Sequence, residues 1–253
     1  ASLRRDKYFN VHATPAEFSA KERGWLSNEL RAHFGRSMGG LSSFMAQQKE
    51  DPGRPGYADP AHLTKTAAAQ LAKHAASSAA APGAALVYSA HPHSYYLREG
   101  ESKETSARFN PGSPEAAAEI ALAYFRQVAP DRICYFEVAN ECNVHTKHLD
   151  ADFADLCALH EVMAHRLRHE LPHLKVGGPT SAWPAFEFDD FRIWREQMGT
   201  FINRVGHVMD FLAVHLYSTH WDDKVNYRFG ANVDAILDLM ESQSLLTHGE
   251  VKP

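Results

Sequence analysis

Residues 135–142 read YFEVANEC, and this stretch decides the fold that we expect. Its first part is aromatic and β-branched, which is typical of a strand, and the apolar residues before its end indicate burial. The stretch then ends in an amide and a carboxylate, Asn140 and Glu141. In α/β barrels, functional side chains lie at the carboxyl ends of the strands. We therefore expect a buried strand over residues 133–138 that carries Asn140 and Glu141 at its functional end.

Runs of the same kind recur along the chain, and helical patterns separate them. Further strands are expected at residues 8–12, 36–39, 84–90, 175–180 and 211–217. Helices are expected over residues 19–34, 59–76, 152–170 and 189–205, from residue 113 onward, and over residues 233–240. Asp59 and Ser113 each precede a proline, so each is predicted to cap the helix that follows. The polar, turn-rich segment 47–57 is predicted to be a loop.

The alternation of strands and helices predicts a parallel sheet built from βα units. Six such units can be counted, whereas a closed (β/α)8 TIM barrel has eight. We therefore expect residues 1–253 to form one catalytic (β/α) barrel domain with about six of the eight strand–helix units. This domain would be truncated before strand seven. An open six-stranded α/β sheet is the alternative.

The composition excludes several kinds of partner. With 26 basic and 31 acidic residues the net charge is −5, and no basic stripe suggests nucleic acid. No apolar run reaches about 18 residues, so we expect no membrane partner. No signal peptide is visible, although the chain begins with Ala1 rather than methionine. Three cysteines, at positions 134, 142 and 157, make no disulfide framework and are expected to be buried small side chains.

A carboxylate at a barrel mouth suits glycoside hydrolysis. That reaction needs two carboxyl groups, one of which is protonated and donates its proton to the leaving oxygen. Partial desolvation and a neighbouring carboxylate raise the pKa of such a group, which favours Glu141 as the acid/base. The amide of Asn140 can hold a sugar hydroxyl, through a hydrogen bond that can strengthen in the transition state.

These residues resemble a known group of enzymes. YFEVANEC resembles the strand-four Asn-Glu motif of clan A glycoside hydrolases, which are retaining enzymes on a (β/α)8 barrel. Residues 214–217, VHLY, resemble the end of strand six in that clan, and residues 5–13, RDKYFNVHA, resemble the start of glycoside hydrolase family 86. The resemblance implies that Glu141 is the acid/base and that His215 and Tyr217 contact the nucleophile or the sugar.

Family 86 contains β-agarases and β-porphyranases, which implies an activity. We expect an endo-acting hydrolase that cuts β-1,4 bonds of a red-algal galactan, agarose or porphyran, without a cofactor. A polysaccharide substrate also implies that the protein is secreted, periplasmic or on the cell surface. Other clan A families cut xylan, cellulose or mannan with the same strand-four motif, so another β-glycanase activity stays open.

The second carboxylate is missing from the motifs. In clan A the nucleophile is a glutamate at the end of strand seven, and we expect that strand and its glutamate beyond Pro253, roughly 10–20 residues further on. Glu250 is the nearest glutamate in the chain. It precedes the expected strand and would therefore lie at the wrong end of the barrel.

Aromatic and histidine residues after the predicted strands are candidate sugar-binding groups, because sugar rings stack on aromatic faces. They are Tyr95, His91 and His93 after the third strand, His145 after the fourth, Trp183 after the fifth and Trp221 after the sixth. Tyr96, His12 and Arg36 are weaker candidates.

Two other classes of function stay open. The pair His91 and His93 has the spacing found in metal-dependent amidohydrolase barrels, but it follows the third strand rather than the first. His160 and His165 resemble a zinc motif with one residue too many, so they point to different faces of a helix. We expect His160 to be a packed helix residue, and no metal. A non-catalytic sugar-binding barrel is the remaining class.

Overall fold

The computed structural model describes the parts of the chain that hold the sheet and its helices. They are residues 10–11, 21, 34–38, 41, 44–45, 50–58, 64–79, 85–90, 113–128, 134–141, 149–182, 189–215, 234, 236–239 and 241–242. All statements on the structure concern these residues.

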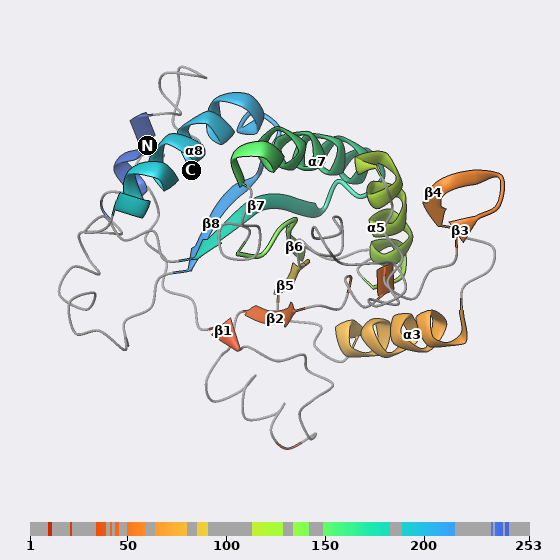
Figure 1. Ribbon diagram of the computed structural model, residues 1–253. Coiled ribbons are helices and arrows are strands. Elements are labelled where there is room, and N and C mark those ends of the chain that lie inside the picture. The colour runs from red at the N-terminus through yellow and green to blue at the C-terminus, as the bar shows by residue number, and fades with distance from the viewer. Residues whose placement is uncertain are drawn as a thin grey trace.

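Six of the described strands form one parallel sheet (Figure 1). They are β1 (Asn10–Val11), β2 (Phe34–Met38), β5 (Ala85–Ser89), β6 (Cys134–Glu137), β7 (Leu174–Ala182) and β8 (Phe211–His215). Their order in the sheet, β1-β2-β5-β6-β7-β8, is their order in the chain, and every neighbouring pair is parallel. A doubly wound open sheet reverses its strand order at a switch point, whereas a barrel winds in one direction. The order among the described strands is therefore that of an α/β TIM barrel.

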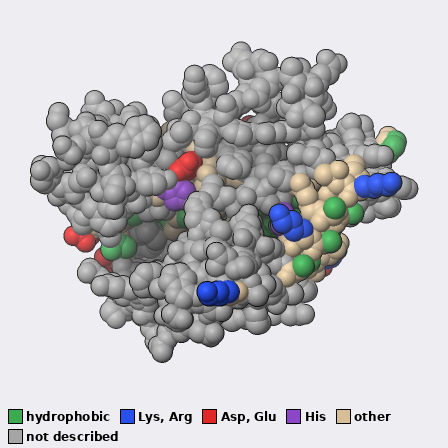
Figure 2. Space-filling view, turned by 90° about the horizontal axis from the view of Figure 1, so that it is seen from below, with side chains coloured by type: hydrophobic (Ala, Val, Ile, Leu, Met, Phe, Trp, Pro, Cys, Tyr) green, Lys and Arg blue, Asp and Glu red, His purple; other side chains and the backbone are tan. Residues whose placement is uncertain are grey.

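Four long helices lie around the outer side of this sheet, one after another (Figure 1). They are α3 (Lys65–Ala79), α5 (Pro114–Val128), α7 (Leu149–Glu170) and α8 (Asp189–Val205). Each packs on the next, α3 on α5, α5 on α7, and α7 on α8. The outward face of α3 carries exposed alanines at 68, 69, 72 and 76 together with Lys65 and Lys73, and it lies toward the viewer in Figure 2.

The core between the helices and the sheet is aromatic. Phe136 of β6 meets Phe125 of α5 at a ring distance of 4.9 Å, and Tyr88 of β5 contacts both Phe125 and Tyr124 edge-on. The hydroxyl of Tyr124 is hydrogen-bonded to Nδ1 of His74 at 3.0 Å, and burial raises the pKa of this phenol well above its usual value. These contacts fix the side of β5 and β6 that faces the helices, so Ser89 and Glu137, one residue further along each strand, face the barrel interior.

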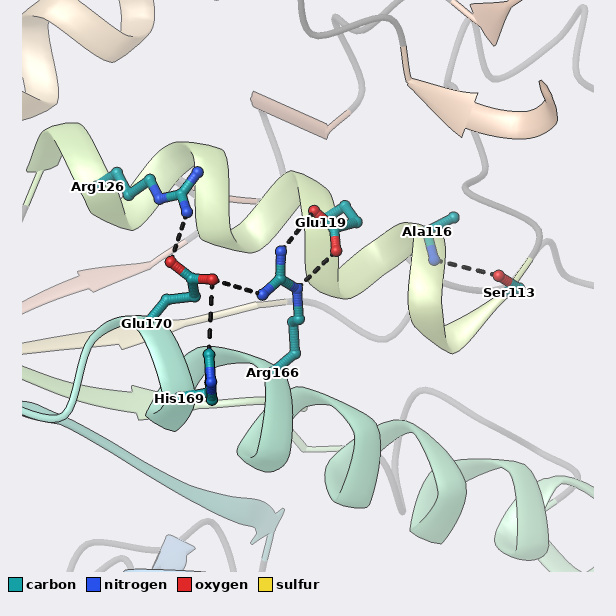
Figure 3. A network of polar contacts seen from close by, with 7 residues as sticks. All are labelled: Ser113, Ala116, Glu119, Arg126, Arg166, His169 and Glu170. Carbon is teal, nitrogen blue, oxygen red and sulfur yellow. Dashed lines mark hydrogen bonds and ion pairs between the residues drawn. The ribbon is translucent and has the colours of Figure 1, made fainter. Parts of the chain in front are cut away.

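Ion pairs add a surface link between α5 and α7 (Figure 3). Arg166 donates to Glu119 at 2.6 Å and to Glu170 at 2.9 Å, while Arg126 donates to Glu170 at 2.7 Å. These hydrogen bonds lower the pKa of Glu170 to about 2. The network joins two helices that already pack against each other. It therefore adds to the stability that this packing provides.

Several predicted boundaries are confirmed. The helix over 189–205 has the predicted bounds, and β6 (Cys134–Glu137) lies within the strand expected over 133–138. Ser113 caps α5, because its hydroxyl oxygen accepts a hydrogen bond from the amide of Ala116 at 3.1 Å (Figure 3). Cys134 and Cys157 are free and buried, as expected, and burial raises the pKa of the Cys157 thiol to about 11. Cys142 lies outside the described residues.

Three predictions were wrong. The segment 47–57 was expected to be a loop, but β3 (Glu50–Asp51) and β4 (Arg54–Ala58) form an antiparallel hairpin there. Its turn, Pro52-Gly53, explains the loop-like composition. The helix expected over residues 59–76 begins at Lys65 as α3, since the hydroxyl oxygen of Thr64 accepts the hydrogen bond from the amide of Ala67. Asp59 itself lies outside the described residues. Phe34 was placed at a helix end and begins β2 instead.

No helix among the described residues is long and apolar enough to cross a membrane.

Candidate active site

The end of β6 is held from both sides by backbone hydrogen bonds. On the β5 side, the amide of Asn140 donates to the carbonyl of Ala90 at 2.8 Å. On the β7 side, the amide of Thr180 donates to the carbonyl of Ala139 at 2.8 Å, and Asn140 forms a parallel bridge with Thr180. The strand end is therefore fixed on two edges before its side chains emerge, which is the rigid support that a catalytic group needs.

Glu141 directly follows this supported strand end and has an unusual backbone conformation. Its φ angle is +48°, in the left-handed region that side chains with a Cβ seldom adopt. Such a conformation costs on the order of 1 kcal/mol, and it persists where the surrounding structure holds it. The hydrogen bonds on either side of Asn140 supply that constraint, so the sharp turn at Glu141 sets the direction of its side chain.

The carboxylate of Glu141 meets His215, which ends β8. Oε1 of Glu141 and Nδ1 of His215 are 2.7 Å apart, and the two side chains are 20% and 16% exposed. The contact therefore joins residues from strands on either side of β7, at the carboxyl end of the sheet. A short bond between a carboxyl group and an imidazole can carry one proton on either partner, which is the property required of a group that both donates and accepts protons.

Asn140 and its neighbours form a small polar layer inside the barrel end. Ser89, Glu137, Asn140 and Thr180 are buried polar residues, and all of them lie near the carboxyl ends of their strands. The hydroxyl of Ser89 donates a short hydrogen bond to Oε2 of Glu137, which is only 8% exposed. A buried carboxylate four residues before Glu141 thus links β5 to β6 beneath the site.

Sequence reasoning missed Ser89, Glu137 and Thr180. The alternation within YFEVANEC could have placed Glu137 on the interior face, because Phe136 next to it packs toward the helices. The partner Ser89, which is 48 residues away, follows only from the register of β5 against β6.

The structure brings together three of the predicted site residues, Asn140, Glu141 and His215. His215 was expected to contact the nucleophile or the sugar, and the described structure shows it against the carboxylate of Glu141. The other predicted site residues lie outside the described part of the chain: Tyr217, Trp221, Trp183, His91, His93, His145 and Tyr95. His12, Tyr96 and Glu250 also lie outside it, and of Arg36 the structure describes the backbone alone.

The histidines of the zinc-like motif lie apart. His160 is fully buried, whereas His165 on the same helix is exposed. This confirms that the i, i+5 spacing points the two side chains to different sides of α7 and that His160 is a packed helix residue.

Three curated relatives are similar in sequence over nearly the whole chain. A β-agarase of Pseudoalteromonas atlantica is 28% identical over 252 residues, covering 90% of this chain and 49% of the agarase. A funoran endo-β-hydrolase of Wenyingzhuangia aestuarii is 27% identical, over 98% of this chain and 37% of the relative. A β-porphyranase A of Phocaeicola plebeius is 27% identical, over 100% and 32%. The chain thus spans about a third to a half of the length of these relatives.

Solved structures show the same relationship. The crystal structure of wild-type BuGH86 in complex with neoagarooctaose matches with a TM-score of 0.71 and 25% identity, over 99% of this chain and 45% of that one. BpGH86A, a β-porphyranase of glycoside hydrolase family 86 from Bacteroides plebeius, matches in fold with a TM-score of 0.62, 23% identity and coverage of 99% and 40%.

A more distant enzyme of family 39, from Xanthomonas axonopodis, shares the fold with a TM-score of 0.55 at 17% identity, over 93% of this chain and 47% of that one. No protein-family model matches the chain. The resemblance to clan A glycoside hydrolases, and within them to family 86, is nevertheless confirmed by the curated relatives and by the solved structures together.

Proposed function

We propose that the full-length protein is an endo-acting, retaining glycoside hydrolase that cuts β-1,4 bonds of a red-algal galactan, agarose or porphyran. The observation that carries this proposal is the pair of Glu141 and His215, 2.7 Å apart at the carboxyl ends of β6 and β8, with Asn140 beside it. A barrel of this class places its reacting groups at that end of the sheet.

Glu141 acts twice in the proposed reaction. In its protonated form it donates a proton to the glycosidic oxygen while a second carboxylate attacks the anomeric carbon, so that the sugar becomes covalently bound to the enzyme. Glu141, now ionised, then accepts a proton from water, and the water oxygen displaces the carboxylate and restores the original configuration. His215 holds Oε1 of Glu141 in place through both steps.

The second carboxylate is proposed to follow residue 253, at the end of the next barrel strand. The retaining mechanism requires the two carboxyl groups to be about 5–5.5 Å apart. We also propose that Tyr217, Trp183, Trp221, Tyr95, His91, His93 and His145 line the sugar-binding groove, because all of them follow strands at the same end of the barrel.

The relatives support the choice of substrate. They are a β-agarase, a β-porphyranase and a funoran endo-β-hydrolase, enzymes that act on red-algal galactans, and the ligand bound to BuGH86 is neoagarooctaose. Because the proposed substrate is a polysaccharide, we also propose that the protein works in the periplasm, on the cell surface or outside the cell.

The test is the activity of the purified full-length protein on agarose and porphyran, with xylan, cellulose and mannan as comparisons. A rapid fall in viscosity with slow release of reducing ends would support endo-cleavage of a galactan. The anomeric proton of the first-formed product, followed by NMR, should have the β configuration of the substrate bond. Activity on xylan, cellulose or mannan alone would move the protein to another clan A specificity.

Variants separate the remaining classes of function. Glu141→Gln should lower hydrolysis of the polymer by about 10²–10⁴-fold, the usual contribution of general acid–base catalysis. Glu241→Gln is the matched control and should keep wild-type activity, because Glu241 is an exposed carboxylate among the described helical residues 236–239 and 241–242. Oligosaccharide binding without hydrolysis would favour a non-catalytic barrel, and loss of activity with a chelator would favour a metal enzyme.

A further inference from the structure

His160 is the one residue of the zinc-like motif that is buried within the fold. It lies on α7 with 0% exposure, and its ring meets Phe201 of α8 edge-on at 4.9 Å. Nδ1 is 2.7 Å from the carbonyl oxygen of Leu156, one turn earlier. Because a carbonyl oxygen can only accept, Nδ1 carries the proton and donates it. In the neutral ring, the other nitrogen, Nε2, therefore presents a lone pair.

The position of this lone pair lowers the stability of the folded protein. Nε2 is buried, and among the described residues no donor forms a hydrogen bond with it. Burial also lowers the pKa of His160 to about 4, so that the ring is neutral at ordinary pH. A buried acceptor without a donor destabilises a protein, whereas an apolar side chain carries no such cost. Packing alone is therefore a poor reason for histidine at this position.

Nε2 points at a bend in β7. A Cβ placed on Gly178 would be 3.3 Å from Nε2 of His160 and 3.5 Å from the amide nitrogens of Val138 and Thr180. Gly178 has a φ angle of +108°, a conformation that side chains with a Cβ avoid, and the register of β7 against β8 shifts between Gly177 and Thr180. The imidazole, the bent glycine and the end of β6 are therefore in one packed stack.

The bend carries the bonds that hold the candidate site. On one side of Gly178, the carbonyl of Gly177 accepts from the amide of Val138 at 3.1 Å. On the other side, the amide of Thr180 donates to Ala139 at 2.8 Å, and Thr180 is bridged to Asn140. A displacement at Gly178 would therefore reach the backbone on which Asn140 and Glu141 are mounted.

We propose that His160 is a positioning residue for Asn140 and Glu141, and that it acts through the bend of β7 at Gly178. Its ring fixes how far the bend can approach α7, and the bend fixes the end of β6. The contact between His160 and Gly178 lies on the helix side of the sheet. The buried pair of Ser89 and Glu137 lies on the opposite side, in the barrel interior. The part of the proposal that concerns catalysis rests on the proposed function above.

The test uses the full-length protein with His160→Leu, and with His165→Leu as the control, which makes the same change at an exposed position of the same helix. Hydrogen exchange is measured for peptides that contain residues 138–141 and 177–182. In His160→Leu we expect exchange at the amides of Asn140 and Thr180 to be at least about tenfold faster, because bonds of the strand end open locally. His165→Leu should leave both amides unchanged.

Kinetics supply a readout that loss of stability alone would not move. The value of kcat/KM is compared between a substrate with a sugar leaving group, which needs the proton from Glu141, and an aryl glycoside whose leaving group does not. Misplacing Glu141 should lower the first value at least about tenfold more than the second. A structural role alone would lower the melting temperature and leave the ratio at its wild-type value.

Wild-type exchange at both amides in folded His160→Leu, together with an unchanged kinetic ratio, would overturn the proposal. If His160→Leu does not fold, His160→Gln takes its place, because glutamine keeps a donor and an acceptor. The same two measurements are then made, and the same results support or overturn the proposal. If the wild-type protein hydrolyses no galactan, the proposed function fails, while the exchange data still test whether His160 positions the end of β6.

Discussion

Acidification between about pH 6.5 and pH 4 should lower the stability of this protein through protonation of His160 in the unfolded chain. In the folded state burial lowers the pKa of His160 to about 4, whereas an unfolded histidine titrates near 6.5. Between these two values the unfolded chain binds a proton that the folded chain does not. The free energy of unfolding therefore falls by about 1.4 kcal/mol per pH unit in that window, and by roughly 3 kcal/mol in total at pH 4.

The assay is urea unfolding at pH 7.5, 6.5, 5.5 and 4.5, with tryptophan fluorescence and circular dichroism as probes. The wild-type protein is compared with His160→Leu, which cannot titrate, and with His165→Leu, which keeps His160. Glu170 does not interfere, because ion pairing lowers its pKa to about 2 and its contribution is lost below pH 4.5. We expect the slope of stability against pH to be shallower in His160→Leu alone. Equal slopes in all three proteins would refute the reasoning.

Four further predictions follow from single contacts. Gly177→Ala should destabilise the fold by about 1–3 kcal/mol in thermal unfolding. A Cβ at this position would be 2.3 Å from the carbonyl oxygen of Phe211, which cannot move aside. A wild-type melting temperature would contradict the packing of β7 on β8. Ser113→Ala should cost about 1 kcal/mol through the lost cap of α5, while Ser113→Thr should cost less. Arg166→Gln should cost no more than about 1 kcal/mol, with the difference shrinking in high salt, since its ion pairs with Glu119 and Glu170 are partly exposed. His215→Ala should lower kcat and change its pH profile while the melting temperature changes little; an unchanged profile would separate His215 from the chemistry.

Local signals were enough for much of the fold. The helix over 189–205 was bounded correctly because its apolar spacing is regular, and Ser113 was recognised because a cap followed by proline is a local signal. The hairpin of β3 and β4 was missed because Pro52 and Gly53 mark a turn whether or not the flanking residues pair. The barrel itself needed the strand order, which only the three-dimensional structure supplies.

The candidate site, like the fold, was predicted from the sequence only in part. Glu141 was found because a carboxylate directly after a buried strand is conspicuous in the sequence. Its contact with His215 joins residues 74 positions apart, and depends on the registers of β6, β7 and β8 and on the left-handed backbone at Glu141. The role that we infer for His160 lay further from sequence reasoning, because it depends on the approach of a helix side chain to a bent glycine.

We propose Glu141 as the acid/base of a retaining hydrolase. The most direct test of this proposal is the reaction of the full-length Glu141→Ala protein with an activated aryl β-glycoside of an agar oligosaccharide, with and without sodium azide. An aryl leaving group needs no proton, so the covalent intermediate should form and accumulate, and azide should then accelerate turnover and give a β-glycosyl azide. An α-glycosyl azide would instead identify Glu141 as the nucleophile. Wild-type turnover in the variant without azide would remove Glu141 from the reaction altogether.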